Sequence, residues 1–186
     1  MLLVPATTAD IGDIVELVNK AYRDENPKGG WTDERELLAG PRIGEERLAD
    51  MIAHENCVVL LCRRYEDAKL IGCVAVKEME HGMWHLSLLA VDPALQAAGL
   101  GRAILTAAEK YVLEREGRSI QITVIGLRKS LLEWYVRRGY AQTGVIEVFP
   151  YDDESVGTPL RQDLSLIVLR KSLDRPTSLR SRETYF

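Results

Sequence analysis

The sequence has few cysteines, no long apolar run and no large excess of either charge, and each of these absences excludes a class of protein. Cys57, Cys62 and Cys73 are an odd number without the spacing of a metal site, so we expect reduced, packed thiols rather than a disulfide framework. No run approaches the ~18–20 apolar residues of a transmembrane helix, and the start of the chain lacks the regions of a signal peptide. These absences predict a cytoplasmic protein with no membrane partner.

The charges are nearly balanced, with 24 Lys and Arg against 28 Asp and Glu and a formal net charge of −4. Proteins that bind nucleic acid through their net charge are basic, so we expect no nucleic-acid partner. The three histidines are not at metal-ligand spacing from the cysteines, so no metal site is predicted. The length of 186 residues and the 46% of hydrophobic residues fit one globular domain.

Apolar periodicity predicts both helices and strands along the chain. The expected helices lie at about residues 10–22, 33–38, 44–52, 100–116 and 129–138, and the expected strands at 2–5, 57–63, 70–77, 83–91, 120–125, 140–149 and 164–170. Three consecutive strands with short turns indicate an antiparallel meander, and the strand–helix–strand unit that follows makes the sheet mixed. We therefore expect an α/β (α+β) fold around a mixed, mostly antiparallel central sheet.

Two glycines between a predicted strand and a predicted helix give the clearest binding signal. Gly99 and Gly101 allow the backbone to approach a ligand closely, and the first helical N–H groups point outward at the positive end of the helix dipole. Such a turn suits a pyrophosphate, to which Gln96 and Arg102 would add hydrogen bonds and charge. A packing turn is the alternative interpretation. The spacing fits neither the Walker loop nor the three-glycine dinucleotide motif.

Two segments carry a resemblance to a known family. Residues 88–101, Leu-Leu-Ala-Val-Asp-Pro-Ala-Leu-Gln-Ala-Ala-Gly-Leu-Gly, resemble motif A of the GNAT N-acetyltransferase superfamily, in which Gln/Arg-x-x-Gly-x-Gly/Ala follows a strand. Residues 132–140, Leu-Glu-Trp-Tyr-Val-Arg-Arg-Gly-Tyr, resemble the second hallmark, a helix that ends in Tyr-x-x-x-Gly-Phe/Tyr. The motifs stand in the family order, and the resemblance covers about residues 2–171.

The resemblance implies a GNAT domain over residues 1–173, with a splayed strand pair and helices on both faces of the sheet, and a flexible tail at 174–186. It also implies acetyl-CoA as co-substrate. The residues expected to hold the coenzyme are Leu89, Ala90, Val91, Gln96, Ala97, Ala98, Gly99, Leu100, Gly101, Arg102 and Arg128. The family usually has Asn and Ala before the tyrosine of the second motif, where this chain has Arg128 and Leu131. We expect Arg128 to reach the phosphates of the coenzyme instead.

The reaction that the resemblance implies is direct attack of a neutral primary amine, on a small molecule or a peptide, on the thioester. Tyr135 is the candidate proton donor to the coenzyme A sulfur, and its alternative role is an aromatic plug at the end of a helix. A backbone N–H of the motif A strand, at Val91, is the candidate for stabilising the oxyanion.

The general base has several candidates. His85 titrates in the useful range, and strand alternation would place it on the same face as Ser87 and Leu89. Glu147, Glu78 and Glu80 compete for the role through a water. For each of them the alternative is a structural or rim residue.

The acceptor site is expected in the segments that resemble the family least. The residues expected to form it are Tyr22, Trp31, Phe149, Tyr151 and Asp152. The aromatic side chains would give apolar walls, and Glu147, Asp152 or Asp153 would pair with a cationic amine. Such an acidic rim favours polyamines, amino sugars, amine antibiotics or a peptide N-terminus, and a solvated acidic turn is the alternative.

A second hypothesis for the function is a GNAT-like module that binds acyl-CoA without turnover, as a sensor or structural subunit. A pure binder needs the glycine turn but no proton donor, so Tyr135 and a base distinguish the two hypotheses. The resemblance also allows a homodimer, since dimers are common in the superfamily.

Overall fold

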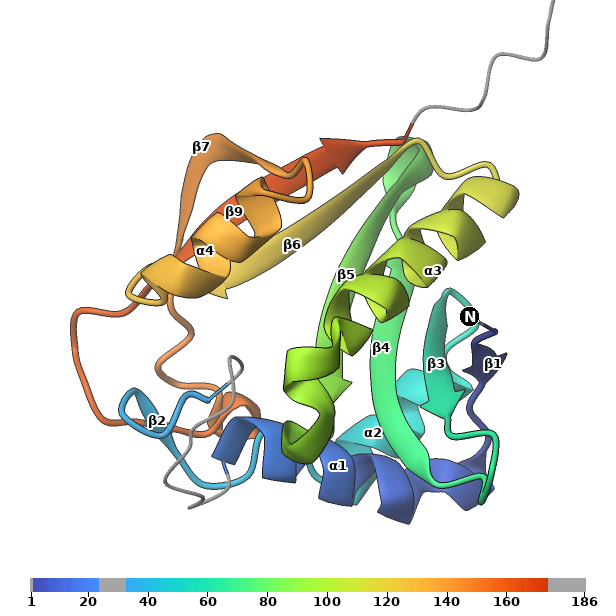
Figure 1. The fold of residues 1–186 in the computed structure, drawn as a ribbon. Helices are drawn as coiled ribbons and strands as arrows, with labels where there is room; N and C mark the ends of the chain where they lie inside the picture. Colours follow the sequence, from blue (N-terminus) through green and yellow to red (C-terminus); the bar gives the residue numbers. More distant parts are fainter. Residues whose placement is uncertain (1, 24–32, 174–186) are drawn as a thin grey trace, which may run out of the picture.

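The structure is a computed structural model that describes residues 2–23 and 33–173 (Figure 1). Its helices are α1 (Ile11–Arg23), α2 (Glu45–Ala53), α3 (Leu100–Glu114) and α4 (Lys129–Val136). Its longer strands are β3 (Cys57–Arg63), β4 (Leu70–Glu78), β5 (Met83–Val91), β6 (Ser119–Ile125), β7 (Ala141–Val148) and β9 (Ser165–Ser172), and its two-residue strands are β1 (Val4–Pro5), β2 (Leu38–Ala39) and β8 (Thr158–Pro159). The expected tail at 174–186 lies outside the described residues, and the extent of the domain stays a prediction.

Within residues 2–23 and 33–173, seven strands form one sheet in the order β1-β3-β4-β5-β6-β9-β7, and β2 pairs with β8 in a second sheet. Among the described strands, neighbours run antiparallel except β5 and β6, which are parallel. This arrangement confirms the predicted α/β fold with a mixed, mostly antiparallel central sheet. None of the helices in the described ranges is long and apolar enough to span a membrane.

Residues 33–38 were expected to form a helix, and this expectation is wrong. They form a turn that leads into β2, where Leu38 pairs with Pro159 of β8. The Leu38 side chain is buried in a small cluster with Phe149 and Leu164. Tertiary pairing and burial therefore outweigh the local helix propensity of this short segment.

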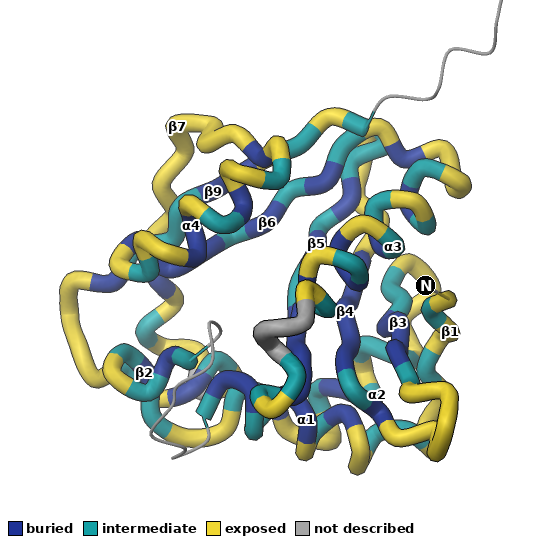
Figure 2. The backbone as a smooth tube through the Cα atoms, viewed as in Figure 1, coloured by how far each residue is buried: buried dark blue, intermediate teal, exposed yellow. Residues whose placement is uncertain are grey.

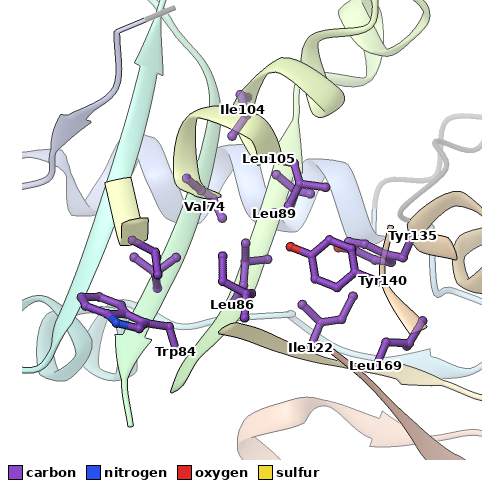
Figure 3. Close-up of a cluster of buried hydrophobic side chains, with 14 of the residues drawn as sticks. Val74, Trp84, Leu86, Leu89, Ile104, Leu105, Ile122, Tyr135, Tyr140 and Leu169 are labelled. Atoms are coloured by element: carbon purple, nitrogen blue, oxygen red, sulfur yellow. The ribbon is translucent and has the colours of Figure 1, made fainter. Parts of the chain in front are cut away.

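Helices cover both faces of the sheet, because neighbouring residues of a strand point to opposite sides. Along β4, Val74 and Val76 belong to the hydrophobic cluster covered by α3 and α4, whereas Cys73 and Ala75 belong to the cluster covered by α1 and α2. Figure 3 shows part of the first cluster, with Ile104 of α3 near Val74. In Figure 2 the central strands β4 and β5 are largely buried, and β7 at the edge is exposed.

Helix α1 places the first residues of the site. Its apolar residues recur at three- and four-residue spacing, so Ile14, Val18 and Tyr22 fall on one buried face. Before it, the Thr7 backbone N–H donates to Asp10 Oδ2 at 2.8 Å, which closes a capping box. The last turn of α1 therefore presents Tyr22 toward β5, where its hydroxyl donates to the Leu89 carbonyl at 3.1 Å.

Strands β5 and β6 pair only at their first residues and then separate. The register joins residues 83–85 of β5 to 119–121 of β6 and ends there. Figure 1 shows the two strands diverging from this point toward α1. The splayed strand pair expected from the resemblance is therefore present.

A bulge in β5 changes which residues face which layer. The register with β4 shifts between Cys73 and Ala75, and Leu88 on β5 has a φ of 50°. As a result Leu88 packs in the cluster on the α1 side, whereas Leu89 packs in the cluster on the α3 side. The expectation that Leu89 shares a face with His85 is wrong, because simple strand alternation does not continue through a bulge.

Candidate active site

A cavity of about 380 Å³ lies where β5 and β6 separate. Residues 85–89 of β5 and 122–125 of β6 line it from both strands, and Tyr22, Tyr135 and Phe149 complete its aromatic wall. A volume of this size accommodates a small molecule. The splay therefore provides a pocket in the middle of the sheet, bounded by helices from both layers.

Tyr135 reaches this cavity from α4 with its ring buried. The ring packs edge-on against Trp134 and Tyr140, with centroids 4.9 and 5.5 Å away, and Figure 3 shows Tyr135 beside Tyr140. Burial raises the pKa of the Tyr135 phenol above its usual value. The side chain is therefore a neutral phenol at physiological pH and can act as a hydrogen-bond donor.

His85 lines the same cavity from β5 and is half-buried. Its Nε2 lies 3.4 Å from Thr123 Oγ1 on β6. Burial lowers the pKa of His85, and the charge of Lys77, its register partner on β4, lowers it further. The imidazole is therefore neutral at physiological pH and able to accept a proton.

The glycine turn begins α3 as the sequence predicts. Gly99 is the N-cap with φ 74°, a left-handed conformation that favours glycine. Gly99 has no side chain to cap this helix start, and the N–H groups of the first turn lie at the positive end of the helix dipole. Arg102 is exposed beside them. The side chains of residues 96–98 lie outside the described part of the structure.

Residues Leu89, Ala90 and Val91 are buried along β5. Ala90 pairs with Cys73 and Val91 pairs with Gly72 in the ladder with β4, whereas Leu88 and Leu89, at the bulge, have no register partner there. A bulge releases backbone groups from the ladder. Leu88 and Leu89 therefore lie outside the ladder with β4, whereas Val91 lies within it.

Arg128 does not occupy the role expected for it. Its Nη1 lies 2.7 Å from Glu34 Oε1, and Glu34 Oε2 lies 2.7 Å from Arg23 Nη1. All three side chains are 8–9% exposed. Buried guanidinium groups require such a carboxylate, so Arg128 belongs to the wall of the cavity rather than to an exposed phosphate site.

The expected acidic rim is not part of the cavity. Glu147 and Asp152 are exposed and do not line it. Tyr151 packs on Phe149, and its hydroxyl accepts from the Leu164 N–H at 2.8 Å. Of the residues proposed for the acceptor, Tyr22 and Phe149 line the cavity, and Trp31 lies outside the described residues.

A comparison with known protein families identifies the family of this chain. The family described as acetyltransferase (GNAT) domain matches residues 21–149, more than half of the chain. The chain belongs to the GNAT acetyltransferase family. This match spans both motifs on which the sequence resemblance rests.

This GNAT domain is similar to several named acetyltransferases. It is similar to mycothiol acetyltransferase from Gordonia bronchialis, with 26% identity over 145 residues, 75% of this chain and 43% of the relative. The chain thus spans less than half the length of that relative. Among solved structures, it is similar to the ribosomal-protein-S18-alanine N-acetyltransferase from Escherichia coli (TM-score 0.67, 17% identity, 100% and 99% of the two chains covered). It is also similar to IAA acetyltransferase from Bacillus cereus (TM-score 0.63, 16% identity, 92% and 99% covered). At these identities the two structures show the fold alone.

Sequence reasoning missed the charged side chains that the GNAT domain places around its cavity. Glu34 was read only as part of a short helix, and Arg42 and Arg47 were not singled out, yet all three line the cavity. Their partners are distant in sequence: Glu34 and Arg128 are 94 residues apart, and Arg47 donates to the Ser155 carbonyl 108 residues away. No local spacing signals such contacts. Among the described residues, no cluster of three His, Cys, Asp or Glu side chains is arranged to hold a metal.

Proposed function

We propose that this GNAT domain is an acyltransferase that moves an acetyl group from acetyl-CoA to a primary amine of a small molecule or peptide. The observation that carries the proposal is that a buried tyrosine and a half-buried, neutral histidine line one cavity between two splayed strands. These two groups have opposite roles in proton transfer. Together they provide what amine attack on a thioester requires.

Two backbone features support acetyl-CoA as the donor. From residue 86 to 90, β5 has no register partner on β6, so an extended amide-containing arm can lie along that edge. The first turn of α3 presents N–H groups and the helix dipole to the pyrophosphate. Leu89, Ala90 and Val91 would bind the arm, and residues 99–102 would bind the phosphates.

Two side chains and one backbone N–H would then act at different steps of the reaction. His85 accepts the proton that the amine must lose before or during attack on the thioester carbon. The backbone N–H at the Leu88–Leu89 bulge faces the charge that develops on the carbonyl oxygen. As the carbon–sulfur bond breaks, Tyr135 donates a hydrogen bond to the sulfur. Because a phenol is a weaker acid than a thiol, this hydrogen bond stabilises the thiolate without requiring complete proton transfer.

The test is release of coenzyme A thiol from acetyl-CoA against a panel of amines. With the best acceptor, Tyr135→Phe should lower kcat by about 10²–10³-fold, as for the loss of one hydrogen bond to the charge that develops in the transition state, and should leave acetyl-CoA binding by calorimetry nearly unchanged. Tyr65→Phe is the matched control, because Tyr65 is 99% exposed. Equal turnover of Tyr135→Phe and the wild type would refute the role of Tyr135.

The same experiment separates the proposal from a non-catalytic module. Tight binding of acetyl-CoA with no turnover on any amine would favour a sensor or structural subunit. Failure to bind acetyl-CoA at all would contradict the donor itself.

A further inference from the structure

The charged side chains that line the cavity are mainly cationic. Among the described residues that line it, the guanidinium groups of Arg42, Arg47 and Arg128 accompany one carboxylate, that of Glu34. His85 adds no charge at physiological pH, because its pKa is lowered. This local balance is opposite to the net charge of −4 of the whole chain, so it is not a consequence of composition.

Two of the three lining guanidinium groups, those of Arg47 and Arg128, already donate hydrogen bonds within the described residues. Arg23 and Arg128 share the Glu34 carboxylate at 2.7 Å each. Arg47 donates through Nη1 to the Ser155 carbonyl at 2.7 Å and to its Oγ at 2.5 Å. Both oxygens of the Glu34 carboxylate therefore already accept a hydrogen bond from a guanidinium group.

The Arg42 guanidinium differs from that of Arg128, which is paired with Glu34, and from that of Arg47, which donates hydrogen bonds to the uncharged Ser155. Its guanidinium lies over the Tyr22 ring at 5.4 Å from the centroid, and within the described ranges no carboxylate lies close enough to pair with it. The residue is half-buried. A partly desolvated guanidinium is most stable when an anion completes its hydrogen bonds.

The backbone at Arg42 is held firmly by Asn19 of α1. Asn19 Oδ1 accepts from the Arg42 N–H at 2.6 Å and the Ile43 N–H at 3.2 Å, and Asn19 Nδ2 donates to the Ile43 carbonyl at 2.9 Å. This clamp and the Tyr22 ring position the guanidinium before any ligand binds. Preorganisation of this kind lowers the cost of binding.

Tyr22 also connects Arg42 to the reacting centre. Its ring carries the Arg42 guanidinium on one face, and its hydroxyl donates to the Leu89 carbonyl, beside the bulge, at 3.1 Å. The Tyr22 side chain therefore lies between the Arg42 guanidinium and strand β5, on which the acetyl group would react. A small acceptor can place an amine at the bulge and an anion at Arg42.

We infer that the acceptor is a small amine that also carries a carboxylate, such as an amino acid, and that Arg42 binds this carboxylate. The inference rests on the proposed acetyltransferase function and names its substrate class. It replaces the cationic acceptors expected from an acidic rim, because Glu147 and Asp152 do not line the cavity. The cavity volume of about 380 Å³ suits such a molecule better than a protein side chain with its backbone.

The kinetic test compares matched acceptors. Amino acids are assayed beside their amides, with putrescine and spermidine as cationic acceptors, in the wild type, Arg42→Gln and Arg115→Gln. Arg115 is the matched control, because it also stacks on a tyrosine, Tyr111, at 3.5 Å but is exposed and does not line this cavity. We expect the wild type to prefer the free acid over its amide, and Arg42→Gln to raise the KM of the acid by about 10–100-fold, as for a lost charge-assisted hydrogen bond. The KM of acetyl-CoA and of the amide should stay unchanged.

A binding measurement keeps the inference testable without turnover. The same amino acids and amides are titrated by calorimetry into coenzyme A-saturated wild type and Arg42→Gln. Binding of acids that is lost in Arg42→Gln supports the carboxylate site even if no acetyl transfer is seen, in which case only the proposed function fails. A preference of the wild type for polyamines, an unchanged acid-to-amide ratio in Arg42→Gln, or no binding of any amino acid would overturn the inference.

Discussion

The buried carboxylate of Glu34 provides the sharpest test of the energetics. Replacing it by glutamine keeps the size of the side chain and one acceptor oxygen but removes the charge. The Arg23 and Arg128 guanidinium groups, each 8% exposed, would then lose the carboxylate that they share. Solvent screens this loss little, because all three side chains are about nine-tenths buried.

The expected magnitude follows from the geometry. Removing one partner of a buried, hydrogen-bonded ion pair costs about 3–5 kcal/mol, and here both contacts are 2.7 Å. This is a large share of the ~5–15 kcal/mol by which domains are stable. For a domain of this size, with ~2–4 °C per kcal/mol, the midpoint of thermal unfolding should fall by about 6–20 °C.

The assay is urea unfolding followed by circular dichroism, with thermal scans at the same pH. Glu36→Gln is the matched control, because Glu36 is exposed two residues away, and it should change the free energy of unfolding by less than about 0.5 kcal/mol. If Glu34→Gln cost no more than Glu36→Gln, the carboxylate would not be the buried ionic centre described above.

Two further predictions concern Gly99 at the start of α3 and His85 on β5. Gly99→Ala should lower the free energy of unfolding by about 1–2 kcal/mol, because the φ of 74° is strained for alanine although its added Cβ meets nothing within 4 Å. Urea titration checks this, and an alanine variant as stable as the wild type would contradict it. The pKa of His85 is lower in the folded protein than its usual value of ~6.5. As the pH falls below ~6.5, the unfolded chain therefore binds this proton before the folded protein does, and the free energy of unfolding decreases. The wild type should lose more thermal stability than His85→Gln between pH 7.5 and 5.5, and the opposite order would show that His85 is stabilised when charged.

The elements with strong local periodicity were predictable from the sequence. The apolar spacing of α1 and the glycine turn before α3 both follow from contacts within a few residues. Strand β2 was not predictable, because Leu38 adopts it through pairing with Pro159, over a hundred residues away.

The site was predictable only in part, for the same physical reason. Tyr135 and His85, on separate elements, are brought to one cavity. The bulge that turns the Leu89 side chain to the α3 side of the sheet depends on tertiary register, and the Glu34 ion pairs depend on burial. Neither leaves a local pattern in the chain, so the charged residues Glu34, Arg42 and Arg47 that line the cavity were not among the predicted site residues.

The most direct measurement is the stoichiometry of the reaction with labelled acetyl-CoA and the best amine acceptor. We expect one acetylated amine, identified by mass spectrometry, for each coenzyme A thiol released, at a rate that falls in Tyr135→Phe. Thiol release without acetylated amine would instead indicate thioester hydrolysis and would contradict acetyl transfer to an amine in this cavity.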